Sequence, residues 1–283
     1  MSMGTGPELI LNAAEGALQL LITEDEALLC AQEWRKADRA TEILAPALDG
    51  MCRALGLKPA GFRRIACVRG PGSFTGIRLV LTTAAALRRA GGARLAGLDY
   101  LQALATSVAQ RQRLPYGAAV WTLTHARRNL VHCQPFMAYG PRIPAQPASP
   151  VELCPPQEAL RRIMSATTAP PEGATQPQRV LVCGSGLARN AAVFAALPGM
   201  GELPLPADAV VAALPDLTLP DAAALCLLAR HGDYFDKDVE PLYVRPCDAV
   251  ENLPDLAPRL GMSGADARAA LDAQLARVPQ SEI

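Results

Sequence analysis

The segment from Val68 to Arg78 has the residue types that could contact a phosphate group. It reads Val-Arg-Gly-Pro-Gly-Ser-Phe-Thr-Gly-Ile-Arg, which predicts a strand end, a tight turn and a helix start. Glycines such as Gly70 and Gly72 can adopt positive φ without steric cost, and a serine or threonine can cap the helix. Free N–H groups at a helix N-terminus attract anions. The residues of this glycine turn that could contact an anion or a nucleotide are Gly70, Gly72, Ser73, Thr75 and Gly76.

The glycine turn matches none of the common motifs for phosphate binding or nucleophilic catalysis. A P-loop requires a lysine after its last glycine, and here Ile77 follows Gly76. Three residues separate Gly72 from Gly76, so the dinucleotide-binding spacing is absent. Ser73 is not in a GxSxG nucleophile elbow, because Pro71 and Thr75 stand where that motif requires glycine. Two interpretations therefore stay open, a phosphate cradle and a purely structural turn.

Histidine and cysteine spacing gives no metal site. None of the eight cysteines forms a CxxC pair, and they are expected to be buried, reduced thiols. The only hint of a ligand pair is His125 with His132, which could be neighbours on a hairpin. We therefore expect neither a metal site nor catalytic residues.

Hydrophobic periodicity predicts the elements that position the glycine turn. Short strands are expected at 8–13, 16–23 and 26–33, a helix at 38–55, a strand at 62–68, a helix at 77–87, a strand at 93–98 and a helix at 100–110. A shortened second set is expected, with strands at 118–124, 129–136, 180–183 and 240–245, a short helix within 151–164, and helices at 187–196 and 220–230. A further helix is expected at 265–278. This order predicts a two-lobed α/β protein with lobes at 1–112 and 113–253 and a tail at 254–283.

The helix at 77–87 is apolar nearly all round, although a surface helix needs only one apolar stripe. One interpretation is that it forms, with the helix at 38–55, a two-helix surface that pairs with another protein. The alternative is that these side chains pack only within their own lobe. The interface residues of the first interpretation are Leu44, Leu48, Met51, Ile77, Arg78, Leu81, Ala84 and Ala85.

Three segments resemble the TsaB (YeaZ) family. Residues 69–78 resemble its RGPGSFTGxR motif, residues 96–105 its GxSxLxxLA segment, and residues 241–245 its PxYxR element. The resemblance implies a fold like that of actin, sugar kinases and heat-shock ATPases, in which a β-β-β-α-β-α-β-α unit is duplicated and the second lobe is reduced. It also implies the four-helix interface formed by two such helix pairs.

The family resemblance implies a non-catalytic subunit of the system that transfers threonylcarbamoyl to adenosine 37 of tRNA. Its expected partners are a TsaD-like catalytic subunit and a TsaE-like ATPase, with a homodimer when the chain is alone and tRNA contacted only through the complex. No cofactor is expected for the chain alone, and ATP or ADP only at the level of the complex. The alternatives are an ATPase or glycoprotease-like enzyme of the same superfamily, and a diverged homodimeric interaction protein.

Departures from the family pattern favour the non-catalytic reading. Asn12 and Ala13 replace the usual Asp-Thr pair, and His125 replaces a carboxylate in the second-lobe hairpin. The HxxxH metal pair of the catalytic paralogue falls on Asp99 and Ala103. Lysine and arginine balance aspartate and glutamate at a formal net charge of zero, whereas a free-standing nucleic-acid binder is usually basic. Without a signal peptide or an apolar run long enough to span a membrane, the chain is expected to be cytoplasmic.

Overall fold

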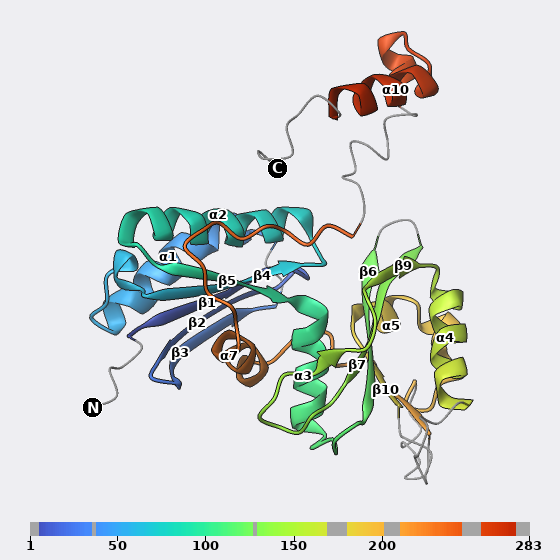
Figure 1. The fold of residues 1–283 in the computed structure, drawn as a ribbon, viewed down its shortest axis with the longest axis horizontal. Coiled ribbons are helices and arrows are strands. Elements are labelled where there is room, and N and C mark those ends of the chain that lie inside the picture. The colour runs from blue at the N-terminus through green and yellow to red at the C-terminus, as the bar shows by residue number, and fades with distance from the viewer. Residues whose placement is uncertain are drawn as a thin grey trace. The chain divides into compact units, whose positions relative to one another are not determined.

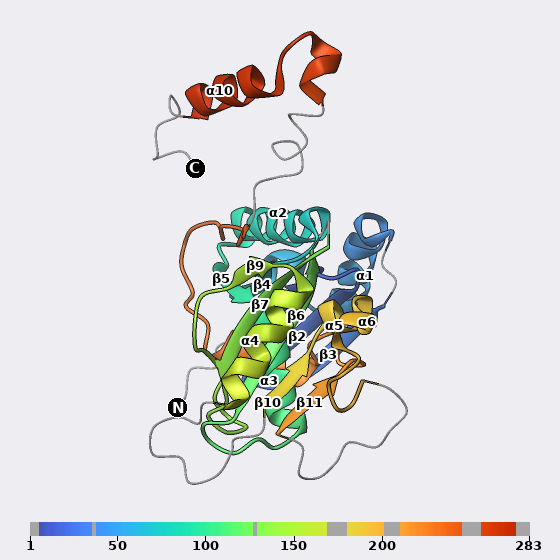
Figure 2. The same ribbon diagram turned by 90° about the vertical axis from the view of Figure 1, so that its right-hand side faces the viewer.

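The computed structural model describes residues 6–35, 38–126, 129–168, 180–200, 210–244 and 256–275. The chain divides into two compact units, residues 1–242 and residues 243–283. The larger unit contains two β-sheets with helices on both faces of each (Figures 1 and 2). The smaller unit contains the 3-10 helix η2 (Ala257–Leu260) and the helix α10 (Gly264–Leu275).

The first sheet has five strands in the order β3-β2-β1-β4-β5. They are β1 (Glu8–Asn12), β2 (Leu18–Glu24), β3 (Ala27–Trp34), β4 (Arg64–Gly70) and β5 (Arg94–Asp99). The first three strands form an antiparallel meander, and β4 and β5 run parallel to β1. Helices α1 (Ala40–Ala54) and α2 (Phe74–Gly91) cover one face, and α3 (Tyr100–Arg111) and α7 (Ala222–Arg230) lie against the other (Figure 1).

Alternation along β1 explains why both faces of the first sheet are covered. Leu9 and Leu11 belong to the core beneath α1 and α2, whereas Ile10 belongs to the core beside α3 and α7. Successive side chains of a strand point to opposite faces. Because all three are fully buried, each face requires a helical layer.

The second sheet has the order β11-β10-β6-β7-β8, with β9 also paired to β7. Its strands are β6 (Ala119–Ala126), β7 (Leu130–Met137), β8 (Gln146–Pro147), β9 (Glu152–Cys154), β10 (Val180–Cys183) and β11 (Val211–Leu214). Helices α4 (Pro156–Thr168), α5 (Ser185–Arg189) and α6 (Ala191–Phe194) cover one face (Figure 2). The connection order and strand order repeat those of the first sheet in shortened form.

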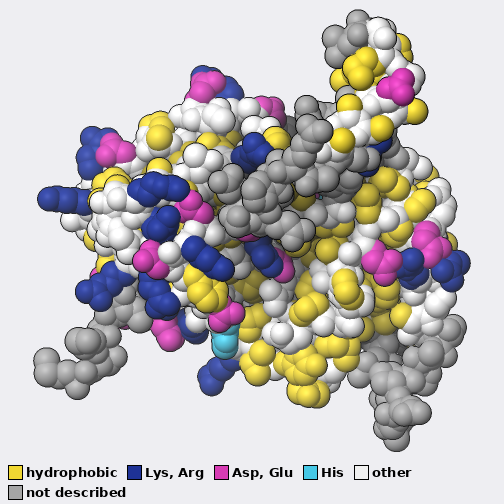
Figure 3. Space-filling view, turned by 45° about the horizontal axis from the view of Figure 1, so that its top comes forward, with side chains coloured by type: hydrophobic (Ala, Val, Ile, Leu, Met, Phe, Trp, Pro, Cys, Tyr) yellow, Lys and Arg dark blue, Asp and Glu magenta, His cyan; other side chains and the backbone are white. Residues whose placement is uncertain are grey.

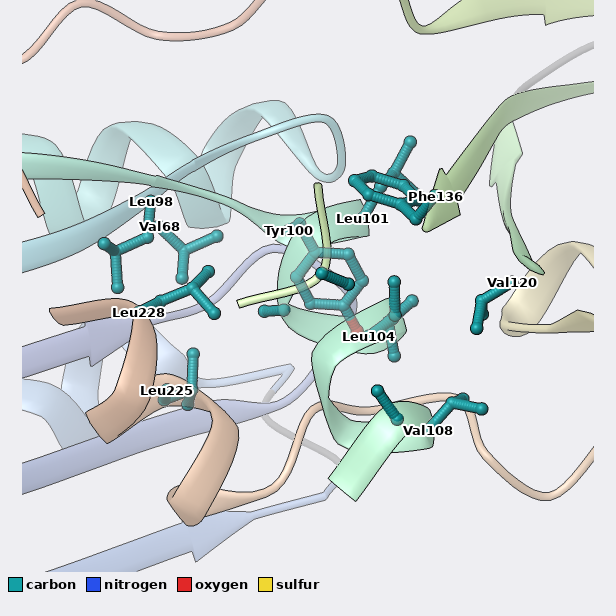
Figure 4. Close-up of a cluster of buried hydrophobic side chains, with 14 of the residues drawn as sticks. Val68, Leu98, Tyr100, Leu101, Leu104, Val108, Val120, Phe136, Leu225 and Leu228 are labelled. Carbon is teal, nitrogen blue, oxygen red and sulfur yellow. The ribbon is translucent and has the colours of Figure 1, made fainter. Parts of the chain in front are cut away.

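Helix α3 lies between the two sheets and joins their cores. Figure 4 shows Tyr100 and Leu104 between Val68 and Leu98 of the first sheet and Val120 and Phe136 of the second. The Tyr100 ring is fully buried, and its hydroxyl donates to the carbonyl oxygen of Thr218 at 2.9 Å. A single apolar cluster therefore continues from one sheet to the other through this helix.

The element order of the first half matches the sequence prediction, and most differences lie in the second half. Strands β8, β9 and β11 were not predicted, because two to four residues give too little periodicity. The expected helix at 187–196 is interrupted at Asn190 and forms α5 and α6. The predicted strand at 240–245 is wrong for residues 240–244, and Arg245 lies outside the described residues. The tail helix is confirmed over 264–275.

Residues 231–242 return to the first sheet. Phe235 forms an antiparallel bridge with Leu95, and the N–H of Leu242 donates to the carbonyl of Arg69 at 2.8 Å. The lobe boundaries at 112 and 253 stay predictions, as does the separate tail. Within the described residues, no helix combines the length and apolarity required to cross a membrane.

Replacing Met51 by alanine tests the packing of α1 on the first sheet. Met51 is 1% exposed within the core beneath α1 and α2, so the variant loses apolar contact and leaves a cavity. We expect the free energy of unfolding to fall by about 2–5 kcal/mol in urea titrations followed by circular dichroism. The exposed Thr41 on the same helix gives the control, and Thr41→Ala should change stability by no more than about 0.5 kcal/mol. Equal effects of the two substitutions would contradict this packing.

Candidate functional site

The glycine turn packs directly against the segment that follows β1. A Cβ atom added to Gly72 would lie 2.2 Å from the carbonyl oxygen of Ala14, and one added to Gly76 would lie 1.9 Å from that of Ala13. Real Cβ atoms do not approach carbonyl oxygens so closely, so only glycine fits at either position. Gly70 has the predicted positive φ of 123°. The prediction for Gly72 is corrected, because this residue is required for close approach and not for positive φ.

Two backbone N–H groups at the start of α2 are hydrogen-bonded within the protein. The N–H of Ser73 donates to the carbonyl of Ala14 at 2.6 Å. The Ser73 hydroxyl accepts from the N–H of Gly76 at 3.3 Å, so Ser73 and not Thr75 caps the helix. Two N–H groups that an anion would require are thus occupied. This geometry favours the structural interpretation, and contact of the turn with an anion or nucleotide stays a prediction.

The third motif segment lies on the other side of the glycine turn. A Cβ atom added to Gly70 would lie 2.9 Å from the carbonyl oxygen of Leu242. The backbone N–H of Leu242 donates to the backbone carbonyl of Arg69. The Arg69 guanidinium in turn donates to Asp99 at 2.7 Å. Asp99, which stands where the catalytic paralogue has a metal-binding histidine, is therefore engaged in an ion pair within the first sheet.

Asn12 at the end of β1 has a structural role. Its side-chain oxygen accepts from the N–H of Ala14 at 3.0 Å, and its amide nitrogen donates to Gln19 at 2.7 Å. Gln19 donates to Glu33 and to the carbonyl of Pro220, both at 2.8 Å. The amide that replaces the family's carboxylate therefore holds the β1–β2 turn and ties it to the segment before α7.

A polar cluster joins the first sheet to the second. The Ser185 hydroxyl at the start of α5 accepts from the N–H of His125 at 2.9 Å and hydrogen-bonds to the carboxylate of Glu15 in the β1–β2 turn. Burial raises the pKa of Glu15 to about 7, and the Ser185 hydroxyl and Arg189 oppose this rise. Gly184 precedes Ser185 and, like Gly72, allows close approach, since an added Cβ would lie 2.0 Å from the carbonyl of Leu123.

The two histidines of the hairpin do not form a ligand pair. Thr124 lies opposite His132 and His125 lies opposite Val131, so the two rings project from opposite faces of the sheet. The Nδ1 atom of His132 is 3.2 Å from the Thr124 hydroxyl. Burial, with Arg189, lowers the pKa of His125, and its buried Nδ1 has no hydrogen-bond partner. Across the described residues, no three histidine, cysteine or acidic side chains are grouped for a metal ion.

Five of the eight predicted interface residues are buried in their own lobe. They hold α1 and α2 on the first sheet and are Leu44, Leu48, Met51, Ile77 and Ala84. Their assignment to a partner contact is therefore corrected, because the sequence shows that a side chain is apolar and not which of two surfaces covers it. Arg78 is exposed, and Leu81 and Ala85 are half-buried.

Apart from Arg78, the outer face of α2 consists of residues that the sequence interpretation did not name. Phe74 is 43% exposed, its ring lies 4.3 Å below the Arg78 guanidinium, and Thr82 and Ala86 are exposed further along the helix. On α1, the exposed residues Ala45, Pro46 and Gly50 have small or compact side chains. Figure 3, which views this side obliquely, shows many charged side chains over the half of the larger unit that holds the first sheet, whereas hydrophobic side chains gather mainly toward the second sheet.

Comparisons with known proteins identify one matching family model and solved structures with the same fold. The model of the TsaD family, tRNA N6-adenosine threonylcarbamoyltransferase, matches residues 35–161. Two solved structures from Pseudomonas aeruginosa have the same fold. YeaZ has 18% identity and a TM-score of 0.62 and covers 84% of this chain and 99% of its own. An uncharacterized protein with similarity to peptidase YeaZ has 19% identity and a TM-score of 0.63, and the match covers 85% of this chain and 100% of that protein. No curated protein matches the sequence significantly.

The matched family model and the shared fold confirm the resemblance and the fold class inferred from the motifs. The match includes the whole glycine turn and both helices α1 and α2, because residues 35–161 span them. The candidate site therefore lies in the part of the chain where the resemblance is supported by both sequence and fold.

Gly76→Ala tests the close approach between α2 and the segment after β1. The added methyl group would overlap the Ala13 carbonyl, so the backbone must shift, and we expect a loss of about 1–3 kcal/mol or more of stability. Gly50 on α1 has nothing within 4 Å of an added Cβ. Gly50→Ala should therefore stabilise the helix by about 0.5–1 kcal/mol. Chemical denaturation of both variants checks the contrast, and a neutral Gly76→Ala would exclude the contact.

The raised pKa of Glu15 predicts a specific pH dependence. Its folded pKa of about 7 exceeds the ordinary value of 4.5, so the native state binds this proton more tightly than the unfolded chain. The contribution of Glu15 to the free energy of unfolding is most favourable below pH 4.5 and declines as the pH rises through about 7. Relative to Glu15→Gln, the wild type should lose about 1–3 kcal/mol of stability across this interval.

The measurement for Glu15 is a set of urea titrations at several pH values for the wild type and the variant. Glu24→Gln, which changes an exposed carboxylate of the same meander, provides the control and should leave the pH profile unaltered. Parallel profiles for the wild type and Glu15→Gln would show that Glu15 is not desolvated as described.

Proposed function

We propose that this chain is a TsaB-type subunit that binds a TsaD-like catalytic subunit and supports threonylcarbamoyl transfer to adenosine 37 of tRNA without catalysing the reaction itself. A TsaE-like ATPase is the further expected partner. The matched family model and the YeaZ fold support this assignment. The non-catalytic role is supported by Asn12 and Asp99, which stand where the family resemblance places catalytic or metal-binding groups. Here Asn12 hydrogen-bonds to Gln19 and Asp99 pairs with Arg69.

The observation that carries the proposal is the outer face of α2, an 18-residue helix fixed at its start by the glycine turn. Its core side chains are sealed against the sheet, so the helix is held rigidly without a partner. The opposite side presents Phe74, Arg78, Thr82 and Ala86. Small residues such as Thr82 and Ala86 allow a second helix to approach closely, while Phe74 and Arg78 supply residue types enriched at interfaces.

Helix α1 extends the proposed surface. Ala45, Pro46 and Gly50 are exposed on it, and a hollow of about 490 Å³ lies beside them, lined by Trp34, Arg39, Glu42, Ile43, Pro46 and Ala47. An aromatic ring and aliphatic side chains at the base of a hollow suit an apolar anchor from a partner. We expect this two-helix surface to bind the catalytic subunit, to pair with a second copy when the chain is alone, and to leave any nucleotide or tRNA contact to the complex.

Substitution at Ala86 tests the proposed interface. Ala86→Arg places a long charged side chain on the exposed face without disturbing the core, so affinity for the organism's TsaD-like subunit should fall about 10-fold or more. Ala166, an exposed alanine on α4, gives the matched control, and Ala166→Arg should bind like the wild type. Calorimetry with the purified partner measures both affinities, and circular dichroism verifies that both variants are folded.

Reconstitution tests the function itself. tRNA threonylcarbamoylation should require this chain together with the TsaD-like and TsaE-like proteins, and Ala86→Arg should reduce it in parallel with binding. Modification by this chain alone would replace the proposal with an enzymatic role. Failure to bind the TsaD-like subunit, with a stable homodimer that Ala86→Arg disrupts, would instead identify a homodimeric interaction protein.

A further inference from the structure

Two cysteines that are far apart in the sequence lie together in the second sheet. Cys133 is on β7 and Cys154 is on β9, and the two strands pair with Val131 opposite Cys154 and Cys133 opposite Glu152. In this register both thiols project from the same face of the sheet as diagonal neighbours. The two thiols interact closely enough for each to shift the pKa of the other. Both are free, and they are 3% and 5% exposed beneath α4.

We propose that Cys133 and Cys154 form a redox-active dithiol, which hydrogen peroxide oxidises to a disulfide joining β7 to β9. The site is independent of the helical surface assigned to partner binding. It is a modification site that the sequence did not indicate, because the two cysteines have no close spacing along the chain.

The surroundings of the pair make Cys154 the nucleophile. The hydrogen bond from Cys133 lowers the pKa of the Cys154 thiol, and the Arg162 guanidinium on α4 contributes in the same direction. Burial and the carboxylates of Glu152 and Glu158 oppose this effect. The same hydrogen bond and burial raise the pKa of Cys133. Thiolates and not thiols attack peroxides, so the pair is polarised toward reaction at Cys154.

Arg162 is held near the pair by its own partners. It donates to Glu158 at 2.7 Å within α4 and also to Glu152 on β9, directly opposite Cys133. These ion pairs fix the cation beside the thiols and join α4 to β9. Because β9 has three residues and pairs only with β7 among the described strands, it can shift to meet disulfide geometry without disrupting other strand pairs.

The reaction balances with one peroxide molecule. The Cys154 thiolate attacks one peroxide oxygen, the O–O bond breaks, and the departing hydroxide takes up the thiol proton as water, which leaves a sulfenic acid on Cys154. The Cys133 sulfur then attacks the Cys154 sulfur, the S–O bond breaks, and the hydroxide leaves as water with the proton of Cys133. Two thiols are oxidised, and the peroxide is reduced to two water molecules.

Two other buried cysteines, Cys67 and Cys183, lack this arrangement. Burial raises the pKa of Cys67 to about 12, and its thiol donates to the carbonyl of Ala96 at 3.6 Å. Cys183 is fully buried, and burial alone raises its pKa. Neither has another thiol among the groups that affect its pKa, so both should resist peroxide. Cys247 lies outside the described residues.

Tryptic mapping of the full chain tests the pairing directly. Cleavage after arginine places Cys133 in the peptide 129–142 and Cys154 in the peptide 143–161, each with a single cysteine. After peroxide treatment of the native chain and alkylation of the remaining thiols, we expect these peptides to be joined with the loss of two hydrogen atoms. Their link should form about 10-fold faster than in the chain unfolded in guanidinium chloride, because the fold raises the local thiol concentration.

Alanine variants assign the two roles. Cys133→Ala should accumulate a sulfenic acid at Cys154 that dimedone traps, whereas Cys154→Ala should leave Cys133 reduced. Cys183→Ala, which removes a buried thiol from the same sheet, should form the 133–154 link as the wild type does. The proposal is overturned if native protein yields no preferential 133–154 link, or if dimedone labels Cys133 in Cys154→Ala and not Cys154 in Cys133→Ala.

Discussion

The contact between the glycine turn and the segment after β1 is the constraint on which the rest of the first lobe depends. Two carbonyl groups, of Ala13 and Ala14, occupy the space that side chains at Gly76 and Gly72 would fill. The N–H of Ser73 meets the same segment, so the start of α2 is fixed in position and direction. Because α2 is a continuous helix of 18 residues, fixing its start also fixes where the exposed side chains of its outer face lie.

The second sheet repeats this construction on a smaller scale. Gly184 approaches the Leu123 carbonyl as Gly72 approaches that of Ala14. A serine follows each glycine: Ser185 is the first residue of α5, and Ser73 is the N-cap of α2. The helix that follows has five residues and not eighteen. Residues at this second turn instead face the first sheet, where Ser185 meets Glu15. The same backbone device thus supports a long outer helix in one lobe and a contact between the lobes in the other.

Polar side chains at the ends of β1 and β5 and at the start of β2 hold the structure together. Asn12 closes the β1–β2 turn, Gln19 extends it to the segment before α7, and Asp99 pairs with Arg69 beside the glycine turn. These contacts fix the β1–β2 turn and the strand ends beside the glycine turn.

The sequence by itself determined the local features, because helix and strand periods and the positive φ of Gly70 depend on neighbouring residues. It therefore predicted the helix α2 and the turn before it, whereas the choice of Ser73 over Thr75 as the cap came from the structure. Only the tertiary structure decided which side of an apolar helix is covered, so Leu44 and Ile77 proved to be core residues. It also decided that Cys133 meets Cys154, since strand register and not chain distance brings such groups together.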